Sequence, residues 1–237
     1  MSLLDGIYST VVVRDILERE KRRGQRQITD SALLRKIVLF LADNIGSNVF
    51  VSSIGNTLMN EGLLEDGKRK GTPSTHTVQA YIGQLLERYF FYEIKRFDIK
   101  GKEYLRILGK YYIVDIGLRN FLLGFRNRDS GHAIENVVYF ELLRRGYDVA
   151  SGKIDNREVG FIATTVDDKP KLLILWGVGL ASFIATTVDD KLYIQVTESM
   201  QSEDVRKREL SPLQKIQDNY EKIVISLEPG LDSSYDG

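Results

Sequence analysis

The sequence predicts an α+β protein whose first part is mainly helical and whose second part contains a mixed sheet. Three segments between residues 29 and 90 carry apolar residues at helical spacing. Two strand-like runs, FYEIKRFDI and EYLRIL, follow and are joined by Lys100-Gly101-Lys102. Further on, the nonapeptide FIATTVDDK occurs twice, at 161–169 and 183–191, and its pattern is typical of a strand followed by a turn.

Composition limits the classes of function. The chain has 237 residues and is 43% hydrophobic, which is enough for one or two domains with a real core. It has no Cys, which excludes disulfides and zinc or iron–sulfur clusters held by Cys, and its two His argue against a multi-His metal site. The net charge of zero excludes a uniformly basic nucleic-acid-binding protein but not a local basic patch.

Charge is divided unevenly along the chain. Residues 1–130 carry 21 Lys and Arg against 15 Asp and Glu, whereas residues 131–237 carry 12 against 18. This change of sign indicates two units with different surfaces. From the order of the elements described below, we expect residues 1–28 to form an N-terminal helix or linker, residues 29–108 a first folded unit and residues 109–237 a second.

The elements of the first unit can be placed from their caps. Asp30 is a candidate N-cap for a helix whose apolar stripe follows at Leu33, Leu34, Ile37, Val38 and Leu41. A short helix is expected from residue 52, and Ser74-Thr75 should cap a third helix that runs to about residue 90.

Three short helices followed by a hairpin is the order of a winged helix-turn-helix, which we predict for residues 29–108. Its third helix would present polar side chains to a DNA major groove, and basic side chains nearby would neutralise phosphates. The alternative is a protein-contact module of the same fold. The candidate DNA-binding residues are Lys68, Arg69, Lys70, Ser74, Thr75, His76, Thr77, Gln79, Lys95, Arg96, Lys100 and Lys102.

The repeated nonapeptide indicates a tandem duplication of 161–182 and 183–202. One of the two copies is surplus to the sheet, and the sequences of the copies suggest no energetic preference between them. The uncharged run from Leu172 to Val188 has 17 residues and several Gly, Ser and Thr, so strands are favoured over a membrane span. We expect the surplus residues to pair as strands or to pack on a second copy of the chain.

Five segments carry a resemblance to a known family: GKYYIVDIGLRN (109–120), GHAIENVVYFELLRRGYDV (131–149), GKIDNREVGFIA (152–163), KLYIQVTESM (191–200) and ELSPLQKIQDNYEKIVISLE (209–228). In this order they resemble the C-terminal region of a large family of prokaryotic AAA-type ATPases. The resemblance implies a winged helix followed by a restriction-endonuclease-like α/β domain with a mixed sheet. It also implies that ATP and Mg²⁺ would bind only an ATPase domain that this chain lacks.

The resemblance further implies where a nuclease site would lie. Such nucleases use a helical acid, an Asp on a strand, and an acid-x-Lys motif on the next strand, which together hold Mg²⁺. Glu135 matches the helical acid, but Gly160, Gln195 and Thr197 stand at the other three positions. We therefore predict a degenerate site with no catalytic residues, no bound metal and no cofactor in this chain.

The leading functional hypothesis is a non-catalytic module that gives an ATPase its nucleic-acid or protein target. Expected partners are double-stranded DNA, a protein, and the ATPase domain of the parent protein; a homo-oligomer is also considered, and a membrane is not. The alternatives are a metal-dependent nuclease with a nonstandard site and an oligomerisation module acting through the duplicated hairpin. No secretory signal is visible at Met1-Ser2-Leu3-Leu4-Asp5, so we expect a cytoplasmic protein.

Overall fold

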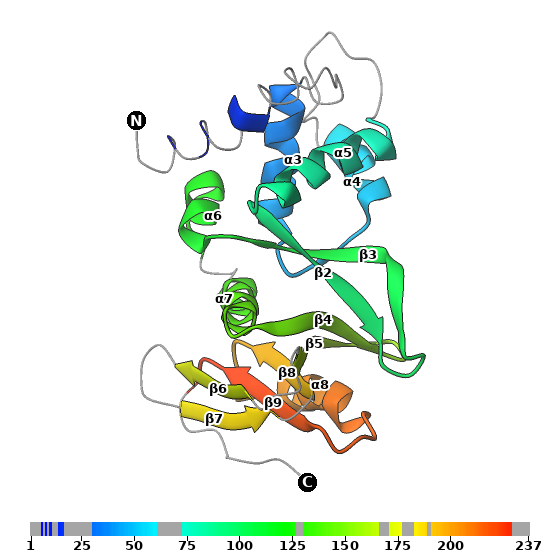
Figure 1. Ribbon diagram of the computed structural model, residues 1–237, viewed down its shortest axis with the longest axis vertical. Helices are drawn as coiled ribbons and strands as arrows, with labels where there is room; N and C mark the ends of the chain where they lie inside the picture. The colour runs from blue at the N-terminus through cyan, green and yellow to red at the C-terminus, as the bar shows by residue number, and fades with distance from the viewer. Residues whose placement is uncertain are drawn as a thin grey trace. The chain divides into compact units, whose positions relative to one another are not determined.

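The computed structural model is a mixed α+β protein with a mixed sheet, as the sequence predicts (Figure 1). It describes residues 6, 8, 10, 14–16, 30–60, 73–126, 130–165, 171–176, 183–188 and 191–228. The chain forms two compact units, Met1–Ile94 with Ile107–Asn127 and Lys95–Arg106 with Arg128–Gly237. No helix in the described ranges has both the length and the apolar character that crossing a membrane would require.

The helices of the first unit begin where capping residues stand. Asp30 accepts hydrogen bonds from the amides of Ala32 and Leu33 and caps α3 (Ser31–Asp43), whose five predicted stripe residues are all buried. Helix α4 (Val51–Asn60) follows. Ser74 accepts a hydrogen bond from the Thr77 amide and caps α5 (Thr75–Glu87). The predicted N-caps of α3 and α5 are therefore confirmed. They can be predicted because a polar cap followed by an apolar stripe is a local signal.

The first unit also contains β1 and parts of β2 and β3. β1 (Asn48–Val49) pairs antiparallel with β3 (Glu103–Ile113) at Asn48↔Lys110 and Val49↔Gly109, and β3 is the sheet neighbour of β2 (Phe91–Asp98). Helix α6 (Ile116–Leu123) follows β3 and is capped by Asp115. Its buried Arg119 donates from Nε to the carbonyl of Ala42 at 2.8 Å, near the end of α3. One apolar cluster joins α3, α4, α5 and the strands.

The second unit is built on one main sheet. Its elements, apart from β6 and β7, which form a separate sheet, are in chain order α7 (Ser130–Arg144), β4 (Tyr147–Ile154), β5 (Arg157–Thr165), β8 (Lys191–Thr197), α8 (Glu203–Gln214) and β9 (Glu221–Ser226). Strands β4, β5 and β8 pair antiparallel in sequence, and β9 pairs parallel to β8. The outer half of β2, Lys95–Asp98, adds a parallel strand to β4. The sheet is therefore mixed: the β2–β4 and β8–β9 pairs are parallel, and the β4–β5 and β5–β8 pairs are antiparallel.

Helices α7 and α8 cover opposite faces of this sheet. Phe161 stacks on Tyr139 of α7, with ring centroids 6.1 Å apart. The next residue, Ile162, packs in a cluster with Leu213 of α8 and Tyr193 of β8. Because consecutive strand residues point to opposite faces, Phe161 marks the α7 face and Ile162 the α8 face.

The duplicated segment forms strands, which confirms the expectation that the surplus residues pair. β6 (Lys171–Trp176) and β7 (Phe183–Val188) pair antiparallel with each other in a two-stranded sheet (Figure 1). The main sheet takes FIATT from the first copy, in β5, and KLYIQVT from the second, in β8. The inner half of each copy is thus placed outside the main sheet.

The two copies differ in the hydrogen bonds that they can make at this place in the sheet. The hydroxyl of Tyr193 donates to Asp218 at 2.6 Å, and the amide nitrogen of Gln195 donates to Glu209 at 2.7 Å. The first copy has Leu173 and Leu175 at the corresponding positions, and leucine can make neither bond. Connectivity acts in the same direction, because β5 follows β4 through a short turn and β8 directly precedes α8.

Candidate nucleic-acid interface

Helix α5 presents a polar outer face and buries an apolar inner one. Thr75, His76 and Gln79 are exposed, and Thr77 is half-buried with its hydroxyl 2.8 Å from that of the N-cap Ser74. The opposite side is buried at Val78, Tyr81, Ile82 and Leu85. The first turn carries no acidic residue, so no carboxylate in that turn offsets the positive end of the helix dipole. The basic candidates that precede this helix, Lys68, Arg69 and Lys70, lie outside the described residues.

The candidate wing residues belong to the second unit. Lys95 and Arg96 lie on the part of β2 that pairs with Ala150 and Ser151 of β4. Lys100 and Lys102 are exposed at the turn between β2 and β3. The predicted set is therefore divided between the two compact units, with the helix residues in one and the hairpin residues in the other.

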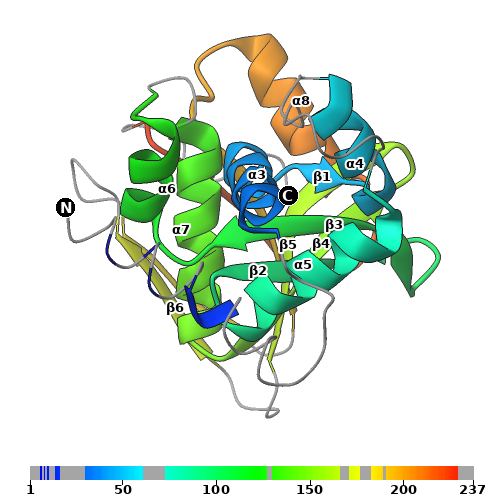
Figure 2. The same cartoon turned by 90° about the horizontal axis from the view of Figure 1, so that it is seen from above.

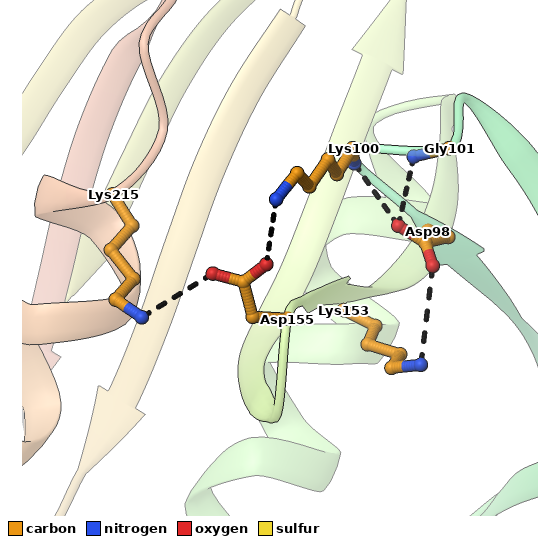
Figure 3. A network of polar contacts seen from close by, with 6 residues as sticks. All are labelled: Asp98, Lys100, Gly101, Lys153, Asp155 and Lys215. Atoms are coloured by element: carbon orange, nitrogen blue, oxygen red, sulfur yellow. Dashed lines mark hydrogen bonds and ion pairs between the residues drawn. The ribbon is translucent and has the colours of Figure 1, made fainter.

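The tip of this hairpin is tied into the second unit by a polar network that we call the turn cluster, made of Asp98, Lys100, Gly101, Lys153, Asp155 and Lys215 (Figure 3). Asp98 accepts hydrogen bonds from the amides of Lys100 and Gly101 and pairs with Lys153 at 3.9 Å. Asp155, in the β4–β5 turn, lies between Lys100 at 3.2 Å and Lys215 at 3.4 Å.

The two lysines change the acidity of Asp155. The hydrogen bond from Lys100, followed by that from Lys215, holds the pKa of this carboxyl below its usual range. Asp155 and Lys100 are well exposed, so each ion pair contributes little to stability. The cluster nevertheless brings ammonium groups from the hairpin turn and from the end of α8 to one carboxylate.

Two of the four degenerate nuclease positions are in contact. The amide of Gly160 donates to the side-chain oxygen of Gln195 at 3.0 Å, and the nitrogen of the same side chain donates to Glu209 of α8 at 2.7 Å. Glu209 is 8% exposed and also accepts from Arg208 at 2.7 Å. Gln195 therefore links the backbone of β5 to a buried carboxylate, a role that sequence reasoning missed.

Gly160 lies in a β-bulge. Gly152 is opposite Val159 and Ala150 is opposite Ile162, so two residues of β5 face the single Ser151 of β4. A Cβ atom on Gly160 would lie 3.0 Å from the carbonyl oxygen of Ile194. An Asp at this position, as the resemblance would require, needs a shift between β5 and β8.

The other two positions do not take part in this contact. Thr197 is buried on the same face of β8 as Gln195, and its hydroxyl donates to the carbonyl of Ser199 at 3.1 Å. Glu135 lies half-buried on α7, the helix that covers the opposite face. Among the residues that the structure describes, no group of three or more His, Asp or Glu is placed to hold a metal ion.

A groove of about 1110 Å³ opens beside Gln195. The start of β5, the middle of β8 and one side of α8 line it. Its cationic side chains are Arg157, Arg206, Lys207 and Arg208. Its anionic side chains are Glu158, Glu203 and Glu209.

Comparison with known proteins gives a family but no activity. Residues 2–129, more than half of the chain, match a domain of unknown function, DUF8612, and the chain belongs to this family. An uncharacterized protein of Haemophilus influenzae is 35% identical over 225 residues, which are 95% of this chain and 46% of that protein. An uncharacterized protein of Methanocaldococcus jannaschii is 29% identical over 163 residues, which are 67% of this chain and 32% of that protein.

The chain thus spans less than half the length of these two curated relatives. No solved structure matches it. The names of the relatives state no activity, so the resemblance to AAA-type ATPases stays a prediction.

Proposed function

We propose that this chain is a non-catalytic nucleic-acid-binding module, which in longer proteins of its kind directs an ATPase to its target. The observation that carries the proposal is the outer face of α5, where Thr75, His76 and Gln79 are exposed above a buried apolar face. Hydroxyl, imidazole and amide groups are those that hydrogen-bond to base edges and phosphates.

The arrangement around α5 supports the proposal. The order α3, β1, α4, α5, β2, β3, with β1 paired to β3, is that expected of a winged helix-turn-helix (Figure 2). In that fold the third helix is the one that enters the major groove. Here the third helix is α5, and the exposed residues of its first two turns, Thr75, His76 and Gln79, are neutral or basic in type.

The second unit supports a scaffold role without chemistry. Its order α7-β4-β5-β8-α8-β9 is compatible with a nuclease-like core. However, Gln195 is engaged by Gly160 and Glu209, and Gly160 leaves no room for a carboxylate without a shift of the neighbouring strand. The alternative of a metal-dependent nuclease predicts nicking of plasmid DNA with Mg²⁺ or Mn²⁺ that Glu135→Ala abolishes; we expect no nicking.

The proposal is tested by fluorescence anisotropy of a labelled duplex at about 50 to about 200 mM salt, because phosphate contacts make binding strongly salt-dependent. His76→Glu with Gln79→Glu places two negative charges on the outer face of α5, and we expect affinity to fall about 10-fold or more. The control, Ser31→Glu with Ala32→Glu, adds the same charge at exposed positions in the first turn of α3. Binding by the α5 variant within about twofold of the unmodified chain would reject the proposal.

A further inference from the structure

The groove beside α8 holds cations whose carboxylate neighbours are already satisfied. Glu203 pairs with Lys207 at 2.6 Å, and Glu209 is bonded to Arg208 and Gln195. Glu158 accepts a hydrogen bond from the hydroxyl of Ser151 at 3.1 Å. Each groove carboxylate therefore accepts a hydrogen bond or an ion pair from within the chain.

Several of the cations are free to turn toward a ligand. The side chain of Lys207 is 71% exposed and that of its partner Glu203 is 76% exposed, and such an exposed ion pair costs only about 0–1 kcal/mol to break. The side chain of Arg208 is also 71% exposed, but its partner Glu209 is buried, so Arg208 would meet a ligand while it keeps that carboxylate paired. Arg157 is exposed and donates to the hydroxyl of Ser211. In the described part of the chain it forms no ion pair with a carboxylate.

The chemistry of the lining favours phosphate over a peptide carboxylate. Three of the four cations are arginines, whose planar guanidinium binds a phosphate through two parallel hydrogen bonds. Among the lining residues that the structure describes, Leu210 and Pro212 are apolar, too few to hold the side chains of a peptide. None of the described lining residues is aromatic, so the groove lacks the ring platforms on which bases usually stack, and its cations favour contact with the nucleic-acid backbone.

The groove continues into the turn cluster along the chain. Gln214 lines the groove and Lys215 follows it, while Arg157 stands two residues after Asp155. Figure 3 shows Lys215 and Lys100 converging on Asp155 from different elements. Basic side chains therefore extend from the middle of α8 to the β2–β3 turn.

We propose that this groove and the lysines of the turn cluster form a second nucleic-acid site, which binds phosphate backbone without reading bases. The inference rests on the proposed function for its class of ligand, but it uses different residues from α5. Arg157, Lys207 and Arg208 contact phosphates in the groove, and Lys100 and Lys215 contact those further along the strand.

The test uses the full chain, the same duplex and a labelled single strand of one of its sequences. Lys207→Glu is expected to weaken binding of both about 5- to 10-fold at low salt and to lower the salt slope by about one. Arg157→Glu should act in the same direction. The matched control is Arg144→Glu on α7, because Arg144 is 68% exposed and, like Lys207, pairs with a glutamate of its own helix.

The outcomes separate this site from α5. Loss of affinity in Lys207→Glu but not in Arg144→Glu supports the groove, whether or not the α5 variant binds. Equal affinities for Lys207→Glu, Arg144→Glu and the unmodified chain overturn it, even where the α5 variant has lost binding. If the unmodified chain binds neither probe at low salt, both proposals fail. The midpoint of thermal unfolding, measured for each variant, must match that of the unmodified chain.

Discussion

Deleting residues 167–188 should leave the main sheet intact and make the protein more stable. The deletion joins Val166 to Asp189 and, because the two copies of FIATTVDDK are identical, leaves one complete copy. The strands β5 and β8 lie outside the deleted residues, so their sequences are unchanged. It removes β6 and β7, which pair only with each other in the described sheets. A direct hairpin of β5 and β8 then replaces the long connection.

The magnitude follows from loop closure. The connection shrinks from residues 166–190 to three residues, Val-Asp-Asp, which is about an eightfold shortening or three halvings. Each halving lowers the entropic cost of closure by about 0.6 kcal/mol, so the free energy of unfolding should rise by about 2 kcal/mol. The lost β6–β7 pair offsets little of this gain, because an isolated two-stranded sheet is marginally stable.

Urea unfolding should be followed by far-UV circular dichroism, because the single tryptophan, Trp176, lies in the deleted segment. A control chain with residues 171–188 replaced by Gly and Ser keeps the loop length but loses the strands. We expect its stability to stay within about 0.5 kcal/mol of the unmodified chain. A deletion variant less stable than the unmodified chain by about 1 kcal/mol or more would show that β6 and β7 support the main sheet, and the reasoning would be refuted.

Two further substitutions test contacts within the second unit. Gln195→Leu puts into β8 the residue type that the other copy carries, so the Gly160 amide and the Glu209 carboxylate each lose one hydrogen bond. We expect the free energy of unfolding in urea to fall by about 1–3 kcal/mol. A fall of less than about 0.5 kcal/mol would contradict the role assigned to Gln195. Lys100→Ala removes the main cause of the lowered pKa of Asp155, so this pKa should rise toward its usual value in a carboxyl NMR titration. Because the folded-state pKa is lowered, the stabilising contribution of these ion pairs is present above the usual Asp pKa and is lost as pH falls through the lowered value. An Asp155 titration curve that does not move in the variant would be evidence against the network.

Local features of the fold were predictable from the sequence. Asp30 and Ser74 cap their helices because a side-chain oxygen next to the first free amides is a short-range signal. The hairpin of β2 and β3 was also predicted, but β3 runs without a break through Gly109 to Ile113, beyond the run EYLRIL. Its pairing with β1 at Gly109 and Lys110 depends on a strand far away in sequence, and local patterns carry no information on such pairing.

The candidate sites were predictable only in part. The exposure of His76 and Gln79 follows from helical periodicity, since Val78 and Ile82 occupy the buried side. The roles of Gln195 and Lys100 did not follow from the sequence, because their partners Glu209 and Asp155 are brought to them by tertiary packing. The polar residues of KLYIQVT that are absent from KLLILW were a signal that could have indicated which copy enters the sheet.

The placement of the duplicated strands has a consequence for how this segment can evolve. In the main sheet, β5 comes from the first copy of the repeat and β8 comes from the second copy. Further copies of the repeat inserted between β5 and β8 would lengthen the connection outside the main sheet and would not change which strands pair within it. The packing of the main sheet thus does not depend on the number of repeats, so descendants of one ancestor could differ in that number and share the same core.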